Sequence, residues 1–236
     1  KYVSNLQRFP AENEVWNDIY NSSINSECVI LGSSRAWVHF SPKIIYENSG
    51  ITTYNLGEDG SDILRQYIRF KEYIKYNESP NKVILNVDLF SLKPNVIPHY
   101  SFYPYIFCNK DVLGYLKEWN YLNFNKAKFL IPMIRYLEFG YLKNFIFDSG
   151  GTPSLQLESK RYAYLFKDAV IDLDENGKLR QKGYRGIEAS LKLDPNISNV
   201  IIEVDGFKVE LLKSLIKEIK NSQIELILVW APELYS

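Results

Sequence analysis

Residues 28–35 read Cys-Val-Ile-Leu-Gly-Ser-Ser-Arg. Four apolar residues that end in a glycine are typical of a buried strand in a parallel sheet. The strand is followed directly by a turn that carries Ser33 and Ser34. In α/β proteins, ligands bind at the carboxyl ends of the strands. The stretch therefore predicts a parallel sheet and places two serine hydroxyls where such sheets bind their ligands.

The segments that follow alternate between helix and strand. A helix is expected from Ser41-Pro42 to Gly50, because serine is a favoured N-cap, proline a favoured first residue and glycine a frequent stop. Residues 51–56 and 82–87 are strand candidates. Between these two strands, Ser61 and Asp62 can cap a longer helix. Its apolar positions share one face: Ile63, Leu64, Tyr67, Ile68 and Ile74.

The end of the chain resumes the same pattern. An amphipathic helix containing Leu211, Leu215 and Ile219 precedes a strand over residues 224–230. Strands separated by helical connections predict an α/β fold, here a three-layer, flavodoxin-like parallel sheet with helices on both faces. The sequence ends just after a core strand, so we expect the final strand–helix unit of this fold to be absent.

The α/β core is predicted to be interrupted by an insertion. We assign residues 1–93 and 200–236 to the core and residues 94–199 to an aromatic-rich, mostly helical subdomain. The insertion also contains Asp-Glu-Asn-Gly-Lys at residues 174–178, and Asn-Gly is the strongest short-range cue for a hairpin turn.

Composition excludes some classes of partner. Lys and Arg total 28, as do Asp and Glu, so the chain lacks the basic surface that nucleic-acid binding needs. Its two cysteines are far apart in a large chain, and Cys28 is expected to be a buried thiol. The chain starts at Lys1 rather than at methionine, so we expect that an upstream segment, such as a signal peptide or membrane anchor, has been removed. The oligomeric state is not indicated.

A second candidate loop follows the second strand and opens the long helix. Residues 55–62 read Asn-Leu-Gly-Glu-Asp-Gly-Ser-Asp. Glycines at a helix amino terminus let backbone amides approach a ligand. The loop matches neither a P-loop nor a dinucleotide-binding fingerprint, and its acidic residues lack the spacing of a calcium loop. We expect neither a metal nor a cofactor.

These two blocks together resemble the SGNH/GDSL hydrolase superfamily, in particular its surface-polysaccharide O-acetyltransferase and esterase branch. The similarity covers about residues 27–92 and, more faintly, 207–233. It implies an enzyme of the acyl-ester class in which Ser34 is the nucleophile. It also implies that backbone N–H groups of Ser34 and Gly60 hold the oxyanion, with Gly57 as the alternative donor.

The chain departs from the superfamily in two blocks. The third block, Gly-x-Asn-Asp, is not matched after the strand at residues 82–87, where Asp88 either faces the site or caps the following turn. The base of the superfamily comes from an Asp-x-x-His block near the C-terminus. The two histidines of this chain, His39 and His99, lie outside any such block. We therefore expect the base to lie C-terminal to residue 236.

Four residues are assigned to substrate binding: Arg35, Asn55, Asp88 and His99. Arg35 either steers an anionic substrate or pairs with a nearby carboxylate. His99 opens an aromatic cluster that either stacks on sugar rings beside the serine or forms the core of the insertion. The members of this cluster include Tyr100, Tyr103, Tyr105, Trp119 and Tyr121.

The function predicted from the sequence is that of a serine-dependent esterase or O-acyltransferase. The expected substrate is an acetyl ester on a cell-surface or extracellular glycan, which places the protein outside the cytoplasm, in the periplasm or cell envelope of a bacterium. One alternative is a catalytically inactive SGNH-like domain that binds a glycan or a protein. A further alternative is an anion-binding domain of flavodoxin-like shape that uses the two loops for a phosphate.

Overall fold

The computed structural model describes residues 10–94, 110–111, 114, 182–184 and 203–230. Within these residues the chain forms a four-stranded parallel sheet with the strand order β2-β1-β3-β4. The strands are β1 (Cys28–Leu31), β2 (Thr53–Asn55), β3 (Lys82–Asn86) and β4 (Glu225–Val229). Helices pack against this sheet, so the predicted α/β class is confirmed.

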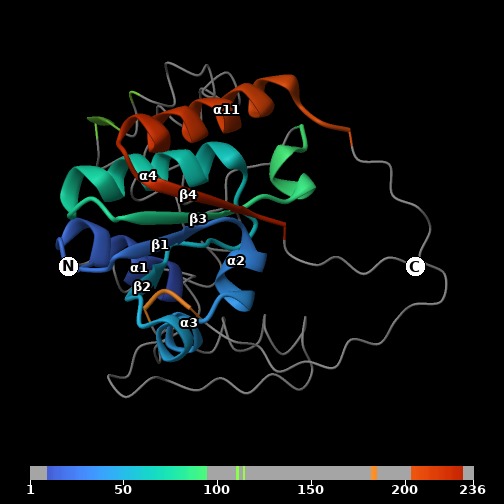
Figure 1. Cartoon of the computed structure of the whole chain (residues 1–236). Coiled ribbons are helices and arrows are strands. Elements are labelled where there is room, and N and C mark those ends of the chain that lie inside the picture. The colour runs from blue at the N-terminus through green and yellow to red at the C-terminus, as the bar shows by residue number, and fades with distance from the viewer. Residues whose placement is uncertain (1–9, 95–109, 112–113, 115–181, 185–202, 231–236) are drawn as a thin grey trace, which may run out of the picture.

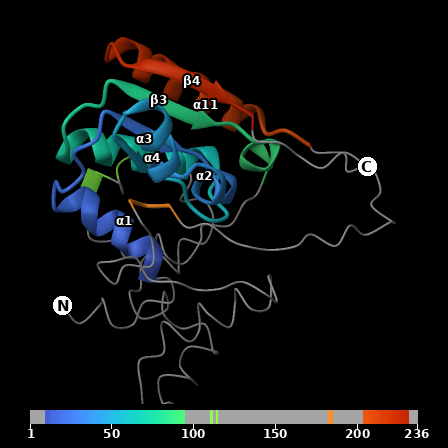
Figure 2. The same ribbon diagram turned by 60° about the horizontal axis from the view of Figure 1, so that its bottom comes forward.

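Helices lie on both sides of the sheet (Figures 1 and 2). On one face, α4 (Ile63–Tyr76) packs between α1 (Pro10–Tyr20) and α11 (Gly206–Asn221). On the other side, beside β1 and β2, are the short helices α2 (Ser34–His39) and α3 (Pro42–Ser49). The carboxyl ends of the strands point to the right in Figure 1, where α2 and the 3₁₀ helix η2 (Leu89–Leu92) follow β1 and β3.

The hydrophobic core lies between the sheet and α1, α4 and α11. Because side chains alternate along a strand, every second residue of β1 and β3 enters this core, whereas Cys28 and Ile30 face the other side. The core also holds Trp16, which is fully buried. Its strand and helix members include Val29, Leu31, Val83, Leu85, Ile68, Phe70, Leu211, Leu215 and Ile219.

The short helix α3 shows how local sequence sets helix boundaries. Ser41 caps it with a side-chain oxygen that accepts from the amide of Ile44, and Pro42 is its first residue. Gly50 ends it with a φ of 71°, in the left-handed region that favours glycine. The predicted helix over this stretch is therefore confirmed at both ends.

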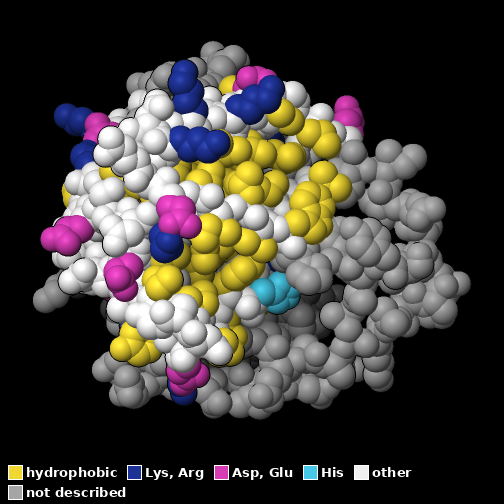
Figure 3. Space-filling model, viewed as in Figure 1, with side chains coloured by type: hydrophobic (Ala, Val, Ile, Leu, Met, Phe, Trp, Pro, Cys, Tyr) yellow, Lys and Arg dark blue, Asp and Glu magenta, His cyan; other side chains and the backbone are white. Residues whose placement is uncertain are grey.

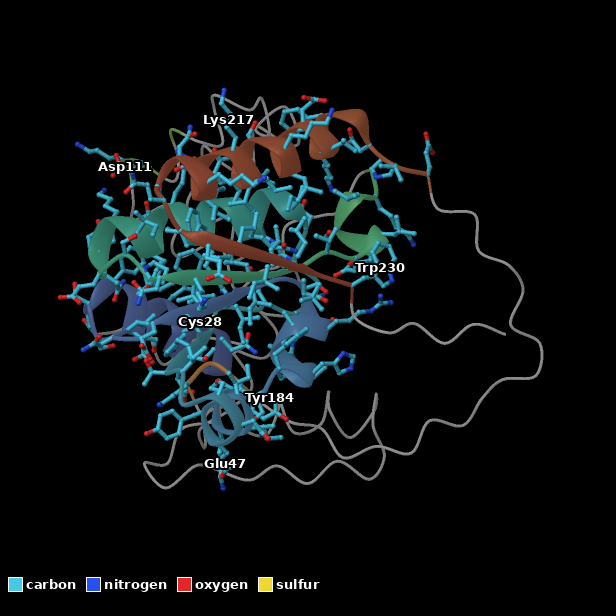
Figure 4. The ribbon with its side chains drawn as sticks, in the orientation of Figure 1. Cys28, Glu47, Asp111, Tyr184, Lys217 and Trp230 are labelled. Carbon is cyan, nitrogen blue, oxygen red and sulfur yellow. The ribbon has the colours of Figure 1, made fainter. Side chains whose placement is uncertain are left out.

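Cys28 lies in β1, one of the two interior strands of the sheet (Figure 4), and carries a free, buried thiol, as predicted. Burial raises the pKa of this thiol to about 11. At neutral pH the sulfur is therefore protonated and unreactive. Toward β4 the sheet is more open: Ile227, Leu228 and Trp230 are exposed, and apolar side chains gather on the face shown in Figure 3.

Helix α4 differs from the prediction, because its burial extends beyond one apolar face. Ile63, Leu64 and Ile68 enter the core as expected. Arg65, Arg69 and several other polar side chains of the helix are also buried. The helix is covered on more than one side, since α1, α11 and the loop after β2 all contact it.

Most of the predicted insertion falls outside the described residues, including His99, the aromatic cluster and the turn at 174–178. Residues 182–184 are described, and they lie against the edge of β2. The amide of Asn55 donates to the carbonyl of Lys182 at 2.8 Å. Among the described residues, the helices are too short or too polar to span a bilayer.

Candidate functional site at the carboxyl edge of the sheet

The two loops singled out from the sequence lie side by side at the carboxyl edge. The amide of Leu56 donates to the carbonyl of Ile30 at 2.8 Å, and the amide of Glu58 donates to the carbonyl of Gly32 at 3.1 Å. The ladder between β1 and β2 therefore continues past the end of both strands. It fixes the loop that contains Gly57 and Gly60 next to the turn that contains Ser33 and Ser34.

The two serines of this turn have different surroundings. Ser33 is buried, and its hydroxyl donates to Asp88 Oδ2 at 2.5 Å. Its oxygen also accepts from the amide of Arg35, so Ser33 is the N-cap of α2. Ser34 is the first residue of α2 and is half-buried. Its hydroxyl has no hydrogen bond to any residue in the described part of the chain, so it is the one of the two that a ligand can engage.

Asp88 is committed to contacts within the protein. It is 1% exposed, and its second carboxylate oxygen, Oδ1, accepts from the amide of Ser91 at 3.0 Å. Asp88 thus caps η2, one of the two roles predicted for it, and it also holds Ser33. Direct contact with a substrate, the other predicted role, would require Asp88 to give up one of these partners.

The structure shows hydrogen bonds of Asn55 within the protein, and the substrate contact predicted for it stays a prediction. Its side chain is fully buried, and its Nδ2 donates to the carbonyls of Ala36 and Phe40, both at 2.9 Å. Its Oδ1 accepts from the amide of Gly57 at 2.9 Å. Asn55 therefore joins β2 to the carboxyl end of α2 and to the neighbouring loop. Because the Gly57 amide is used in this way, Gly60 is the better placed of the two predicted oxyanion donors.

We expect Gly57→Ala to lower the free energy of unfolding by about 3 kcal/mol, as overpacking of a tight site does. A Cβ at this position would lie 2.7 Å from the backbone nitrogen of Trp37 and 2.9 Å from the Cβ of Ala36. The backbone of α2 cannot yield without breaking its contacts with Asn55. Urea unfolding followed by circular dichroism measures the effect.

The matched control for this prediction is Gly206→Ala at the start of α11. A Cβ there meets nothing within 4 Å, and alanine is the better helix former. This variant should be as stable as the wild type or slightly more stable. Equal losses in the two variants would contradict the close approach at Gly57.

A set of buried charges, which the sequence interpretation did not identify, lies behind the Gly57–Gly60 loop. The Oε1 of Glu58 lies 3.6 Å from Arg65 Nη1 and 3.6 Å from Arg69 Nη2, and all three side chains are 1% exposed. On the side toward α11, Lys208 Nζ lies 3.1 Å from Asp62 Oδ2. Charges are almost never fully buried unless they are paired. The cluster therefore joins the loop to α4 and α11.

One pattern in the sequence indicates this cluster. Two basic residues, Arg65 and Arg69, lie between the acidic residues Asp62 and Glu72 at spacings of three and four residues, which puts all four on one side of a helix. Such a stripe is commonly a solvated face. Here it is buried because the loop after β2 folds back over it, and local sequence gives no sign of that contact.

The histidine at the end of α2 is not directed at Ser34. His39 follows Ser34 by five residues, which separates the two by about 140° around the helix axis. Loss of solvent around the imidazole and, to a smaller extent, the charge of Arg35 lower the pKa of His39. Arg35 itself is half-buried on the same helix. No histidine among the described residues therefore lies in a position to act as a base for Ser34.

These observations define the class of protein: a parallel α/β protein with an accessible serine at the start of the helix that follows β1, an interior strand of the sheet. No family model and no curated protein matches the chain. A solved structure from Streptococcus pneumonia, described as "a putative platelet activating factor", matches weakly, with a TM-score of 0.29 and 11% sequence identity. The match covers 90% of this chain and 91% of that chain. At this score the match carries no argument about function.

Proposed function

We propose that this chain is a serine-dependent esterase or O-acyltransferase with Ser34 as its nucleophile. The observation that supports the proposal most strongly is the pairing of the two loops through Glu58 and Gly32. This pairing holds the loop that contains Gly60 beside the turn that precedes Ser34, and the Gly60 amide has no acceptor among the described residues. A hydroxyl beside a preorganised N–H donor is the arrangement that acyl transfer requires.

In the proposed reaction, Ser34 Oγ attacks the acyl carbon while its proton passes to a general base. The backbone amides of Ser34 and Gly60 donate to the oxyanion of the tetrahedral intermediate. The ester C–O bond then breaks, and the leaving oxygen takes up the proton. Water or a sugar hydroxyl attacks the acyl-serine in the second half of the reaction, which gives hydrolysis or transfer respectively.

We propose acetylated cell-surface or extracellular glycans as substrates, and hence a location outside the cytoplasm. Both follow from the resemblance of the Gly32–Arg35 and Asn55–Gly60 blocks to the surface-polysaccharide branch of the SGNH/GDSL superfamily. That resemblance also implies a base from an Asp-x-x-His block, which this sequence lacks. The protein to assay is therefore the one that the complete gene encodes.

Covalent labelling tests this proposal directly. We expect a fluorophosphonate probe to modify the native protein at Ser34, and peptide mass spectrometry identifies the modified residue. The labelled protein should no longer hydrolyse 4-nitrophenyl acetate. Ser61, which is fully buried in the neighbouring loop, provides an internal control and should remain unmodified. Modification of other serines with Ser34 intact would count against the nucleophile assignment.

The alternative is a catalytically inactive domain that uses the same edge to bind a glycan or a protein. The observation that favours it is the lack of a suitably placed base among the described residues. In the labelling experiment this alternative predicts no modification of Ser34 and no ester hydrolysis. It also predicts that binding of an acetylated glycan, measured by calorimetry, is unaffected when Ser34 is replaced by alanine.

A further inference from the structure

The loop after β2 contains a β-turn over residues 58–61 that sets the direction of one amide. The amide of Ser61 donates to the carbonyl of Glu58 at 3.2 Å and closes the turn. Gly60, the third residue, has a φ of 60°, whereas Asp59 does not have a positive φ. A positive φ at the third residue alone makes this a type II turn. Its central peptide, between Asp59 and Gly60, is turned over relative to that of a type I turn.

The side chain of Arg65 binds the inner side of this turn. Its Nη2 donates to the carbonyl oxygen of Gly60 and lies 3.5 Å from the carbonyl oxygen of Asp59. The guanidinium is held in the buried cluster by Glu58. In a trans peptide the C=O and N–H groups point in opposite directions. Since the Asp59 carbonyl points toward Arg65, the Gly60 N–H points away from the buried guanidinium.

This direction matters because of where the turn lies. Its first residue, Glu58, is hydrogen-bonded to Gly32, two residues before Ser34. We propose that Arg65 is a positioning residue, which fixes the Asp59–Gly60 peptide so that the Gly60 N–H is held out toward an ester carbonyl oxygen bound at Ser34. The inference rests on the proposed function, and it adds a residue outside the site that controls one of the oxyanion donors.

Arg69 provides a matched comparison one helical turn away. It shares with Arg65 the same helix, the same burial and the same 3.6 Å approach to Glu58 Oε1. Its Nη1, however, donates to the carbonyls of Leu56 and Gly57, at 2.9 and 3.3 Å. Arg69 therefore holds the start of the loop, whereas Arg65 binds the carbonyls of Asp59 and Gly60 in the turn.

The test compares Arg65→Lys with Arg69→Lys in the protein that the complete gene encodes. Lysine keeps the charge but has a single head group, which cannot bridge Glu58 and the turn carbonyls as the guanidinium fork does. The assay measures the hydrolysis of 4-nitrophenyl acetate. The concentration of active sites is counted by labelling each variant to completion with a fluorophosphonate, and kcat is calculated from that concentration. This normalisation removes the effect of any unfolded fraction.

For Arg65→Lys we expect kcat to fall about 10- to 100-fold with KM within about threefold of the wild type, since a displaced oxyanion donor acts mainly on the transition state. For Arg69→Lys we expect kcat and KM to stay within about threefold of the wild-type values, because only the start of the loop is affected. Equal losses of kcat in the two variants, or a loss confined to KM, would overturn the proposal.

If Arg65→Lys fails to fold, the variant Gly60→Ala tests the same proposal. A Cβ on Gly60 would lie 3.9 Å from Arg65 Nη2 and so would not clash, but a φ of 60° is strained for alanine. Gly60→Ala favours a type I turn, in which the central peptide is reversed. It should therefore show the same loss of kcat as Arg65→Lys, and an unchanged kcat would refute the proposal.

Crystal structures separate this inference from the proposed function. If the wild type hydrolyses no ester, or if Ser34→Ala is as active as the wild type, the proposed function fails. The orientation of the Asp59–Gly60 peptide in Arg65→Lys still decides the role of Arg65. A reversed or disordered peptide supports positioning by Arg65, and a peptide oriented as in the wild type rules it out.

Discussion

Replacing Ser34 by alanine should lower kcat for a small acetyl ester by about 1,000-fold or more, as loss of a serine nucleophile does. The folding stability should change little. The hydroxyl of Ser34 makes no hydrogen bond within the described part of the chain, and alanine is a good residue for the first turn of a helix. Steady-state hydrolysis of 4-nitrophenyl acetate and thermal unfolding measure the two effects.

Ser33→Ala is the control for this variant, and it should behave in the opposite way. It removes the 2.5 Å hydrogen bond to Asp88 and the N-cap of α2. We expect a loss of about 2 kcal/mol in the free energy of unfolding, with kcat of the folded protein within about tenfold of the wild type. If Ser33→Ala abolished activity and Ser34→Ala did not, the nucleophile would be Ser33, with Asp88 as its base.

Asn55→Ala should cause the largest loss of stability among the variants considered, about 4 kcal/mol. Alanine would leave the carbonyls of Ala36 and Phe40 and the amide of Gly57 without partners. Each buried polar group left unsatisfied costs about 1–3 kcal/mol. Because all three groups border the two loops, ester hydrolysis should be lost as well. Urea denaturation monitored by circular dichroism measures the change in stability.

Asn48→Ala provides the comparison for a surface asparagine. Asn48 is exposed on α3 and donates one hydrogen bond, to the carbonyl of Ile44 at 2.8 Å. Its replacement should change the free energy of unfolding by less than about 0.5 kcal/mol. A loss in Asn55→Ala no larger than this would mean that Asn55 does not join β2 to α2.

Local sequence predicted the elements that depend on local physics. The apolar run before Gly32 is a buried strand, and Ser41, Pro42 and Gly50 bound a helix as expected. Strand bounds were less well predicted: β2 is limited to Thr53–Asn55 within the expected residues 51–56. The helix α1 was not predicted.

The nucleophile assignment and the choice of Gly60 over Gly57 came from the sequence and its resemblance to a superfamily, and both stay predictions. The structure adds the reason for preferring Gly60, which is that Asn55 occupies the amide of Gly57. The substrate contacts predicted for Arg35, Asn55, Asp88 and His99 also stay predictions, and His99 lies outside the described residues.

The sequence by itself determined the parallel sheet and the placement of Ser33 and Ser34 at its carboxyl edge, because periodicity, caps and turns depend on neighbouring residues. Only the tertiary structure decided which serine is accessible. Ser33 is paired with Asp88, which lies 55 residues away in the sequence. The two meet because β1 and β3 are adjacent in the sheet. Contacts of this kind depend on strand order, which residue patterns within a single segment do not encode.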